Sequence, residues 1–149
     1  MAVSKSLQRL LRIRDLQEEQ HRLALESAVV ELRELEGAGT AAGERERQGR
    51  ELIGASVQAG RPVDRQAGLE QAAAARRQAR CLAQRAVIAE KEAMRLRQIL
   101  LEKRVERRQA ETLVSESEAE ALVESNRRSQ QALDDWHGSR KHGEKSARG

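Results

Sequence analysis

Side chains that could perform catalysis or bind a metal are few and scattered in this sequence. The chain has one cysteine, Cys81, and three histidines, His21, His137 and His142. One thiol and three separated imidazoles do not provide the ligand set of a common structural zinc site. The sequence also lacks the GxxxxGK[ST], HExxH and GxSxG motifs, which mark phosphate-binding loops, zinc proteases and serine nucleophiles. We therefore expect no enzymatic activity, no cofactor and no metal.

Basic side chains are concentrated between residues 76 and 108, where eleven bases accompany four acids. Such a run could be a nucleic-acid-binding stripe, or it could complement an acidic segment elsewhere in the chain. No aromatic residue is interleaved for base stacking. The second interpretation is therefore favoured, and no nucleic-acid partner is expected.

The composition is that of long helices. Charged residues make up 35% of the 149 residues, and the chain has no Phe, no Tyr, one Trp and one Pro. With a single aromatic residue, a large globular core is difficult to build, so an all-α coiled coil is expected. No segment is apolar over 18 residues, so we expect no insertion into a membrane, and the lone cysteine fits a cytoplasmic protein.

The strongest turn signal is the segment that contains Pro62, the only proline. Gly60 suits the left-handed position after a helix end, proline cannot continue that helix, and Asp64 is a candidate N-cap of the next one. We expect one coiled-coil hairpin over residues 1–136 with its turn near residues 59–64. The last residues, 137–149, carry a net charge of +3 and three glycines, and are predicted to be a disordered basic tail.

The second arm has the clearest apolar periodicity. Nine apolar residues, six of them alanine, follow one another at spacings of three and four and predict one helical seam: Ala72, Ala75, Ala79, Leu82, Ala86, Ala89, Ala93, Leu96 and Leu100. The many alanines favour a narrow helix pair. From there the seam is expected to shift by one position and to follow Leu101, Val105, Arg108, Thr112, Ser115, Ala119, Leu122, Asn126, Ser129, Leu133 and Trp136.

The first arm has a shorter seam, at Leu25, Ala28, Leu32 and Leu35. Five glycines follow between residues 37 and 54, and each costs a helix roughly 0.5–1 kcal/mol relative to alanine. The helix either continues through them or breaks near residues 37–43. Because residues 44–53 otherwise favour a helix, continuity is the favoured interpretation.

Charge gives an independent indication of pairing. A turn near residues 60–62 pairs positions whose numbers sum to about 122. Residues 15–36 have a net charge of −5 and would face residues 86–107, which have a net charge of +2. Residues 4–14, at +4, would face residues 108–118, at −2. The pattern predicts a long antiparallel two-helix hairpin whose C-terminal helix overhangs from about residue 119.

The overhang would leave apolar residues without a partner. Trp136 is the only aromatic, and tryptophan is a frequent interface anchor. It could therefore contact another protein, or it could pack back on Leu7 and Leu10.

Both ends of the chain resemble one protein family. The segment from Leu7 to Glu19, LQRLLRIRDLQEE, is similar to the start of FliJ proteins of the flagellar export apparatus. The segment from Asn126 to Trp136, NRRSQQALDDW, resembles that family's C-terminal pattern. The related YscO and HrpO proteins of type III secretion injectisomes have similar ends, so both branches remain open.

The resemblance implies an antiparallel two-helix protein that acts as the central stalk of a type III export ATPase. Family members occupy the pore of the hexameric ATPase, contact the export-gate membrane protein, and in some cases bind export chaperones. The implied location is cytoplasmic, peripheral to the inner-membrane secretion apparatus. The ATPase-binding residues that the resemblance indicates lie at both ends of the chain: Leu7, Leu10, Leu11, Asn126, Arg127, Gln130, Leu133, Asp134, Asp135 and Trp136.

Two other functions fit parts of the pattern. A generic coiled-coil scaffold would self-associate through its helices. A nucleic-acid-binding rod would use the basic run, and its binding would weaken steeply with salt.

Overall fold

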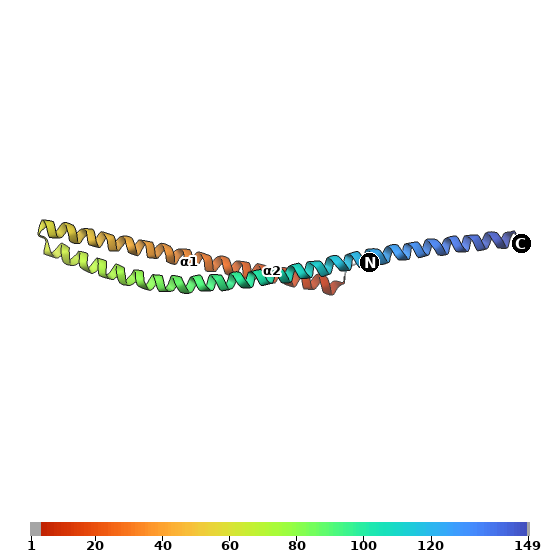
Figure 1. Ribbon diagram of the computed structural model, residues 1–149, viewed down its shortest axis with the longest axis horizontal. Coiled ribbons are helices and arrows are strands. Elements are labelled where there is room, and N and C mark those ends of the chain that lie inside the picture. The colour runs from red at the N-terminus through yellow and green to blue at the C-terminus, as the bar shows by residue number, and fades with distance from the viewer. Residues whose placement is uncertain (1–3, 149) are drawn as a thin grey trace. The chain divides into compact units, whose positions relative to one another are not determined.

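The computed structural model describes residues 4–148, which form two long helices and contain no strand. Helix α1 is Lys5–Ala59 and helix α2 is Pro62–Ala147 (Figure 1). The predicted all-α class is confirmed, and the two helices pack against each other. Alanine, leucine, glutamate and arginine dominate the sequence, and all four are strong helix formers.

Helix α1 runs through its glycines without a break, so the interpretation favoured by the sequence is correct. Ion pairs one turn apart accompany the glycine-rich stretch: Arg47 pairs with Glu44 and Glu51, and Arg50 pairs with Glu46. Each such pair stabilises a helix by about 0.2–0.5 kcal/mol. Together they offset part of the cost of the glycines.

The turn between the helices consists of Gly60 and Arg61. Gly60 has a φ of 66°, the left-handed conformation that the sequence predicts there. The Arg61 N–H donates to the Ser56 carbonyl oxygen at 2.9 Å, a bond that is typical of a glycine-terminated helix. Pro62 is the first residue of α2, a position that needs no N–H donor. The prediction that Asp64 is the N-cap is wrong, because Asp64 lies inside the first turn of α2.

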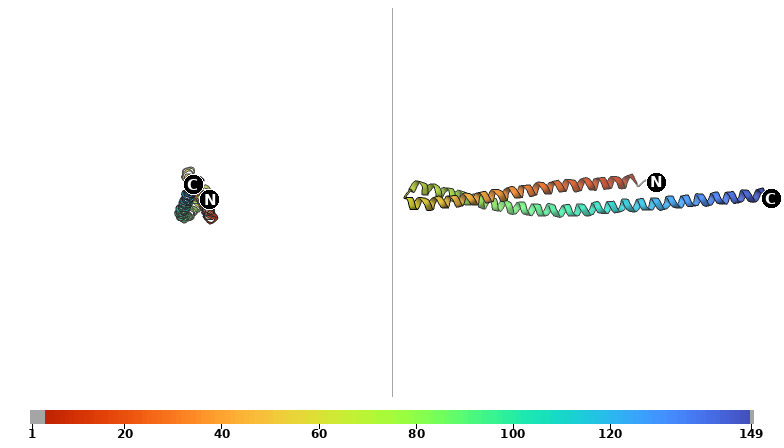
Figure 2. Two further views of the ribbon diagram at one scale, coloured as in Figure 1. Left: turned by 90° about the vertical axis from the view of Figure 1, so that its right-hand side faces the viewer. Right: turned by 90° about the horizontal axis from the view of Figure 1, so that it is seen from above.

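The chain divides into two compact units. The turn unit is Glu19–Leu101. The described residues of the terminal unit are 4–18 and 102–148. In the turn unit, Glu46 pairs with Arg76, and the Arg45 guanidinium donates to the Gln78 side chain. The numbers of these paired residues sum to 122 and 123, so α1 and α2 are antiparallel here. Figures 1 and 2 show them side by side.

The interior of the turn unit is a narrow seam of small residues. All nine residues of the predicted α2 seam are buried or half-buried. The most apolar part contains Leu35, Ala42 and Leu82, with four half-buried alanines around them. On α1 the buried positions recur every seven residues and become small toward the turn: Leu35, Ala42, Gly49 and Ser56. The helices therefore approach most closely near the turn.

In the terminal unit the interface keeps its spacing and does not shift. The buried and half-buried residues of α2 continue at intervals of three and four: Lys103, Arg107, Ala110, Val114, Ser117, Ala121 and Glu124. Glu106, beside Arg107, is half-buried as well. The predicted seam through Leu101, Val105 and Leu122 is wrong, because these residues are exposed. Long side chains such as Lys103 and Arg107 cover the interface with their aliphatic stems while their charges remain near water.

The C-terminal residues also differ from the prediction. The sequence predicts disorder for residues 137–149, whereas α2 continues to Ala147. Arg140 lies over the Trp136 ring, 5.3 Å from its centroid, and pairs with Glu144 at 3.8 Å. These contacts between successive turns favour the helix, and no proline interrupts it. Gly149 lies outside the described residues.

None of the helices in residues 4–148 contains an apolar stretch long enough to cross a membrane.

Candidate partner-binding surface

The C-terminal part of α2 is the most exposed part of the terminal unit. Every residue from 125 to 148 is exposed. Leu133 and Trp136 are 54% and 55% exposed. This stretch contains all the C-terminal residues that the resemblance indicates: Asn126, Arg127, Gln130, Leu133, Asp134, Asp135 and Trp136. They are therefore accessible to another protein.

Local contacts order this surface without burying it. The Gln130 amide donates to an Asp134 carboxylate oxygen at 3.3 Å. The Trp136 ring meets the His137 ring edge-on, with centroids 5.1 Å apart, and Arg140 lies over the same indole. A cation over an indole attracts it by about 0.5–1 kcal/mol at exposed sites. The indole is thus oriented in solvent, next to the acidic pair Asp134 and Asp135.

The N-terminal residues of the predicted site lie in a different environment. Leu7, Leu10 and Leu11 are half-buried, and on α2 the half-buried residues of this unit end at Glu124. The structure therefore does not join them and Trp136 into one surface, and Trp136 lies in solvent rather than against Leu7 and Leu10. The N-terminal leucines belong to the helix interface.

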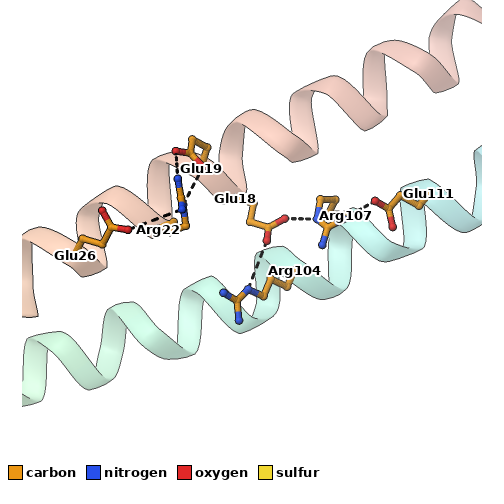
Figure 3. Close-up of polar contacts among 7 residues, drawn as sticks. All are labelled: Glu18, Glu19, Arg22, Glu26, Arg104, Arg107 and Glu111. Atoms are coloured by element: carbon orange, nitrogen blue, oxygen red, sulfur yellow. Dashed lines mark hydrogen bonds and ion pairs between the residues drawn. The ribbon is translucent and has the colours of Figure 1, made fainter.

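Ion pairs hold the two helices of the terminal unit together. Glu18 on α1 forms ion pairs with two arginines of α2, Arg104 at 3.5 Å and Arg107 (Figure 3). Arg107 also donates a hydrogen bond to the Glu18 carboxylate. Arg14 pairs with Glu106 at 3.1 Å. The hydrogen bond that the Arg107 guanidinium donates to Glu18 is the main cause that raises the pKa of Arg107. The acidic segment of α1 and the basic segment of α2 do meet at Glu18, as the charge pattern predicts.

The α1 partners account for only part of the basic run. Of its eleven bases, three pair with α1: Arg76, Arg104 and Arg107. Arg95 and Lys103 pair within α2. Within the described part of the chain, six bases form no ion pair: Arg77, Arg80, Arg85, Lys91, Arg97 and Arg108. Complementarity to α1 is thus an incomplete explanation of this run.

A second apolar stripe on α2 was not predicted from the sequence. Val87, Met94 and Leu101 recur every seven residues and are exposed, so they point away from α1. The spacing of seven is the sequence signal for this stripe, and the stripe leads into Leu101, the first residue of the seam predicted beyond Leu100. A surface hollow in the turn unit lies on this stripe and is lined by Lys91, Met94, Arg95, Gln98 and Ile99.

A second hollow lies on α2 in the terminal unit. Its lining consists of Val105, Arg108, Gln109, Thr112, Leu113 and Glu116. In both hollows, four of the residues stand at relative positions 0, 3, 4 and 7. This is the arrangement that receives one side chain of a facing helix in a coiled coil.

The side chains that could perform catalysis or bind a metal do not lie together. Cys81 is exposed and His21 is half-buried. In residues 4–148 no three His, Cys, Asp or Glu side chains form a group that could hold a metal ion.

No protein-family model, no curated protein and no solved structure matches this chain.

Proposed function

We propose that this protein is a non-enzymatic central stalk of a type III protein export ATPase, of the FliJ, YscO or HrpO kind. In this proposal the chain is a long antiparallel coiled-coil hairpin with an overhanging C-terminal helix. It couples a hexameric ATPase ring to the export-gate membrane protein, and it also escorts export chaperones. It acts in the cytoplasm, at the periphery of the inner-membrane secretion apparatus.

The pairing within each unit supports the hairpin. Contacts in the turn unit join residues whose numbers sum to 122 or 123. In the terminal unit the pairs Arg14–Glu106 and Glu18–Arg104 sum to 120 and 122. One turn at Gly60 and Arg61 is sufficient to produce this register.

The observation that carries the proposal is the half-exposed pair Leu133 and Trp136. They lie in a stretch of α2 in which every residue from 125 to 148 is exposed. An indole ordered at the surface beside a leucine is a typical interface anchor. The ATPase contact is therefore assigned to the C-terminal pattern of α2.

A long helical protein can transmit position even where it performs no chemistry. A single stalk in a six-fold ring contacts the subunits unequally. Unequal contacts stabilise different nucleotide states in different subunits, which is the requirement for coupling between two sites. The acidic pair Asp134 and Asp135 and the bases Arg127 and Arg128 give this surface charges of both signs.

The experiment measures ATP hydrolysis by a purified type III export ATPase with and without the full-length chain. We expect the chain to raise the rate, and we expect the double variant Leu133→Ala/Trp136→Ala to lose most of this stimulation. A matched control is Val57→Ala/Val63→Ala, two exposed apolar residues outside the C-terminal pattern, which should stimulate normally. Absence of both binding and stimulation by the wild-type chain would refute the proposal.

A further inference from the structure

The outward face of α2 in the turn unit is a second coiled-coil seam on which no other segment of the unit packs. Its apolar residues Val87, Met94 and Leu101 are 52%, 61% and 52% exposed. The hollow beside Met94 has the lining that receives a side chain from a facing helix. The face therefore has the geometry of an acceptor for one more helix.

This acceptor face is strongly basic. Residues 76–101 contain seven bases and two acids, a net charge of +5. Arg77, Arg80, Lys91 and Arg97 form no ion pair within the described part of the chain. The helix that fits here must combine aliphatic residues with acidic ones.

The outward face of α1 in the same unit has these properties. Leu23 and Val30 are spaced by seven, like the apolar residues of the acceptor, and about half of each is exposed. Residues 19–37 contain five acids and two bases, a net charge of −3. Within the described residues, Glu31, Glu34 and Glu36 form no ion pair.

We propose that the outward face of α1 in one copy of this chain docks on the outward face of α2 in a second copy. Leu23 and Val30 enter the stripe formed by Val87, Met94 and Leu101, and the free glutamates face the free bases. The exposed residues of the acceptor face are aliphatic, which favours a protein helix as the partner. A surface that binds a nucleic acid would offer aromatic side chains on which the bases stack.

The geometry determines how such assembly proceeds. Donor and acceptor faces belong to different helices, so a pair of copies keeps one free donor face on one copy and one free acceptor face on the other. This is a heterologous contact, and it continues beyond a dimer as the concentration rises. Because the charges lie in water, the association weakens with salt.

The test is sedimentation velocity of the full-length chain alone, so its result does not depend on the stalk proposal. From about 1 to about 200 µM, the sedimentation coefficient should rise with concentration in about 50 mM salt. In about 500 mM salt it should stay at the value of the monomer over the same range. Two charge-reversal variants remove one face each: Arg80→Glu/Lys91→Glu/Arg97→Glu and Glu31→Lys/Glu34→Lys/Glu36→Lys. Each alone should associate at least about tenfold more weakly.

Mixing the two variants is the decisive measurement. The acidic α2 face of one then fits the basic α1 face of the other, so an equimolar mixture should associate again. The reversed residues form no ion pair within residues 4–148, so both variants should keep the helical circular dichroism of the wild type. A control with the same change elsewhere, Lys141→Glu/Lys145→Glu/Arg148→Glu, should associate like the wild type.

Three results would overturn the proposal. They are a wild-type chain that is monomeric throughout, a variant that associates as well as the wild type, and a mixture that stays monomeric. A monomeric chain that instead binds a single-stranded RNA through Arg80, Lys91 and Arg97 would assign the face to a nucleic acid.

Discussion

Gly68 and Gly49 face each other so closely in the turn unit that a Cβ on Gly68 would lie 2.9 Å from the Gly49 carbonyl oxygen. A Cβ on Gly49 would lie 2.8 Å from the Ala72 nitrogen. The two backbones are therefore in contact at this level of the helix pair. Near the turn, the pair is stabilised by close backbone approach rather than by large side chains.

The first prediction concerns these two glycines. Gly49→Ala and Gly68→Ala each force the helices apart, and overpacking of this kind costs about 1–3 kcal/mol. The higher helix propensity of alanine stabilises the helix by at most about 1 kcal/mol, which does not offset this cost. We expect both variants to have lower melting temperatures by circular dichroism.

Gly54 is the matched control, because a Cβ there meets no atom within 4 Å. Gly54→Ala should raise stability by about 0.5–1 kcal/mol. If all three variants were stabilised equally, the close approach would be contradicted.

The second prediction compares two adjacent leucines. Leu100 is 4% exposed and Leu101 is 52% exposed. Leu100→Ala should cost about 2–5 kcal/mol of unfolding free energy, as for a buried leucine. Leu101→Ala should remain within about 0.5 kcal/mol of the wild type. Urea denaturation measures both unfolding free energies. A larger decrease for Leu101→Ala than for Leu100→Ala would indicate that the interface runs through Leu101 and would contradict the structure.

The third prediction is a pH dependence from Glu46. The hydrogen bond from Arg76 is the main cause that holds the pKa of Glu46 below its usual value of 4.5. A carboxyl group with a depressed folded pKa stabilises the fold above its unfolded pKa, and this stability is lost as the pH falls through the folded pKa. Glu46→Gln should therefore melt below the wild type near about pH 7 and match it near about pH 2.

Glu31, which has no ion pair among the residues that the structure describes, provides the control for this comparison. Glu31→Gln should melt like the wild type at both values of pH. If Glu46→Gln still melted below the wild type in acid, the lower melting temperature would result from packing rather than from charge.

The fourth prediction concerns hydrogen exchange along α2. Residues 72–100 contain a buried or half-buried position every three or four residues, whereas all of residues 125–148 are exposed. A helix without tertiary packing opens readily. Peptides from residues 125–147 should exchange much faster than peptides from residues 72–100 in mass-spectrometric measurements. Equal protection would indicate that the C-terminal stretch is packed, for example against a second copy.

Much of the fold follows from local patterns. The all-α class, the continuity of α1 and all nine packed positions from Ala72 to Leu100 are correctly predicted. These features depend on helix propensity and on a period of three and four residues, which neighbouring residues encode. The left-handed Gly60 follows from the same kind of information.

The prediction of the α2 interface beyond Leu100 failed because it needed the partner helix. Beyond Leu100, α2 has two stripes with helical spacing, one rich in apolar residues and one containing Lys103, Glu106 and Arg107. Hydrophobicity favours the first, but Arg14 and Glu18 on α1 pair with the charges of the second. For the candidate site, exposure of Trp136 and burial of Leu7 likewise depend on where the packing between the helices ends.

The sequence by itself determined that this protein is helical, where its chain turns and which face of α2 is packed near the turn. All of these depend on interactions within a few residues along the chain. Only the tertiary structure decided that Gly49 and Gly68 serve close approach, that charged stems cover the interface of the terminal unit, and that Val87, Met94 and Leu101 remain exposed. These outcomes depend on which side chains meet across two antiparallel helices, and the residues that meet there are far apart in the sequence.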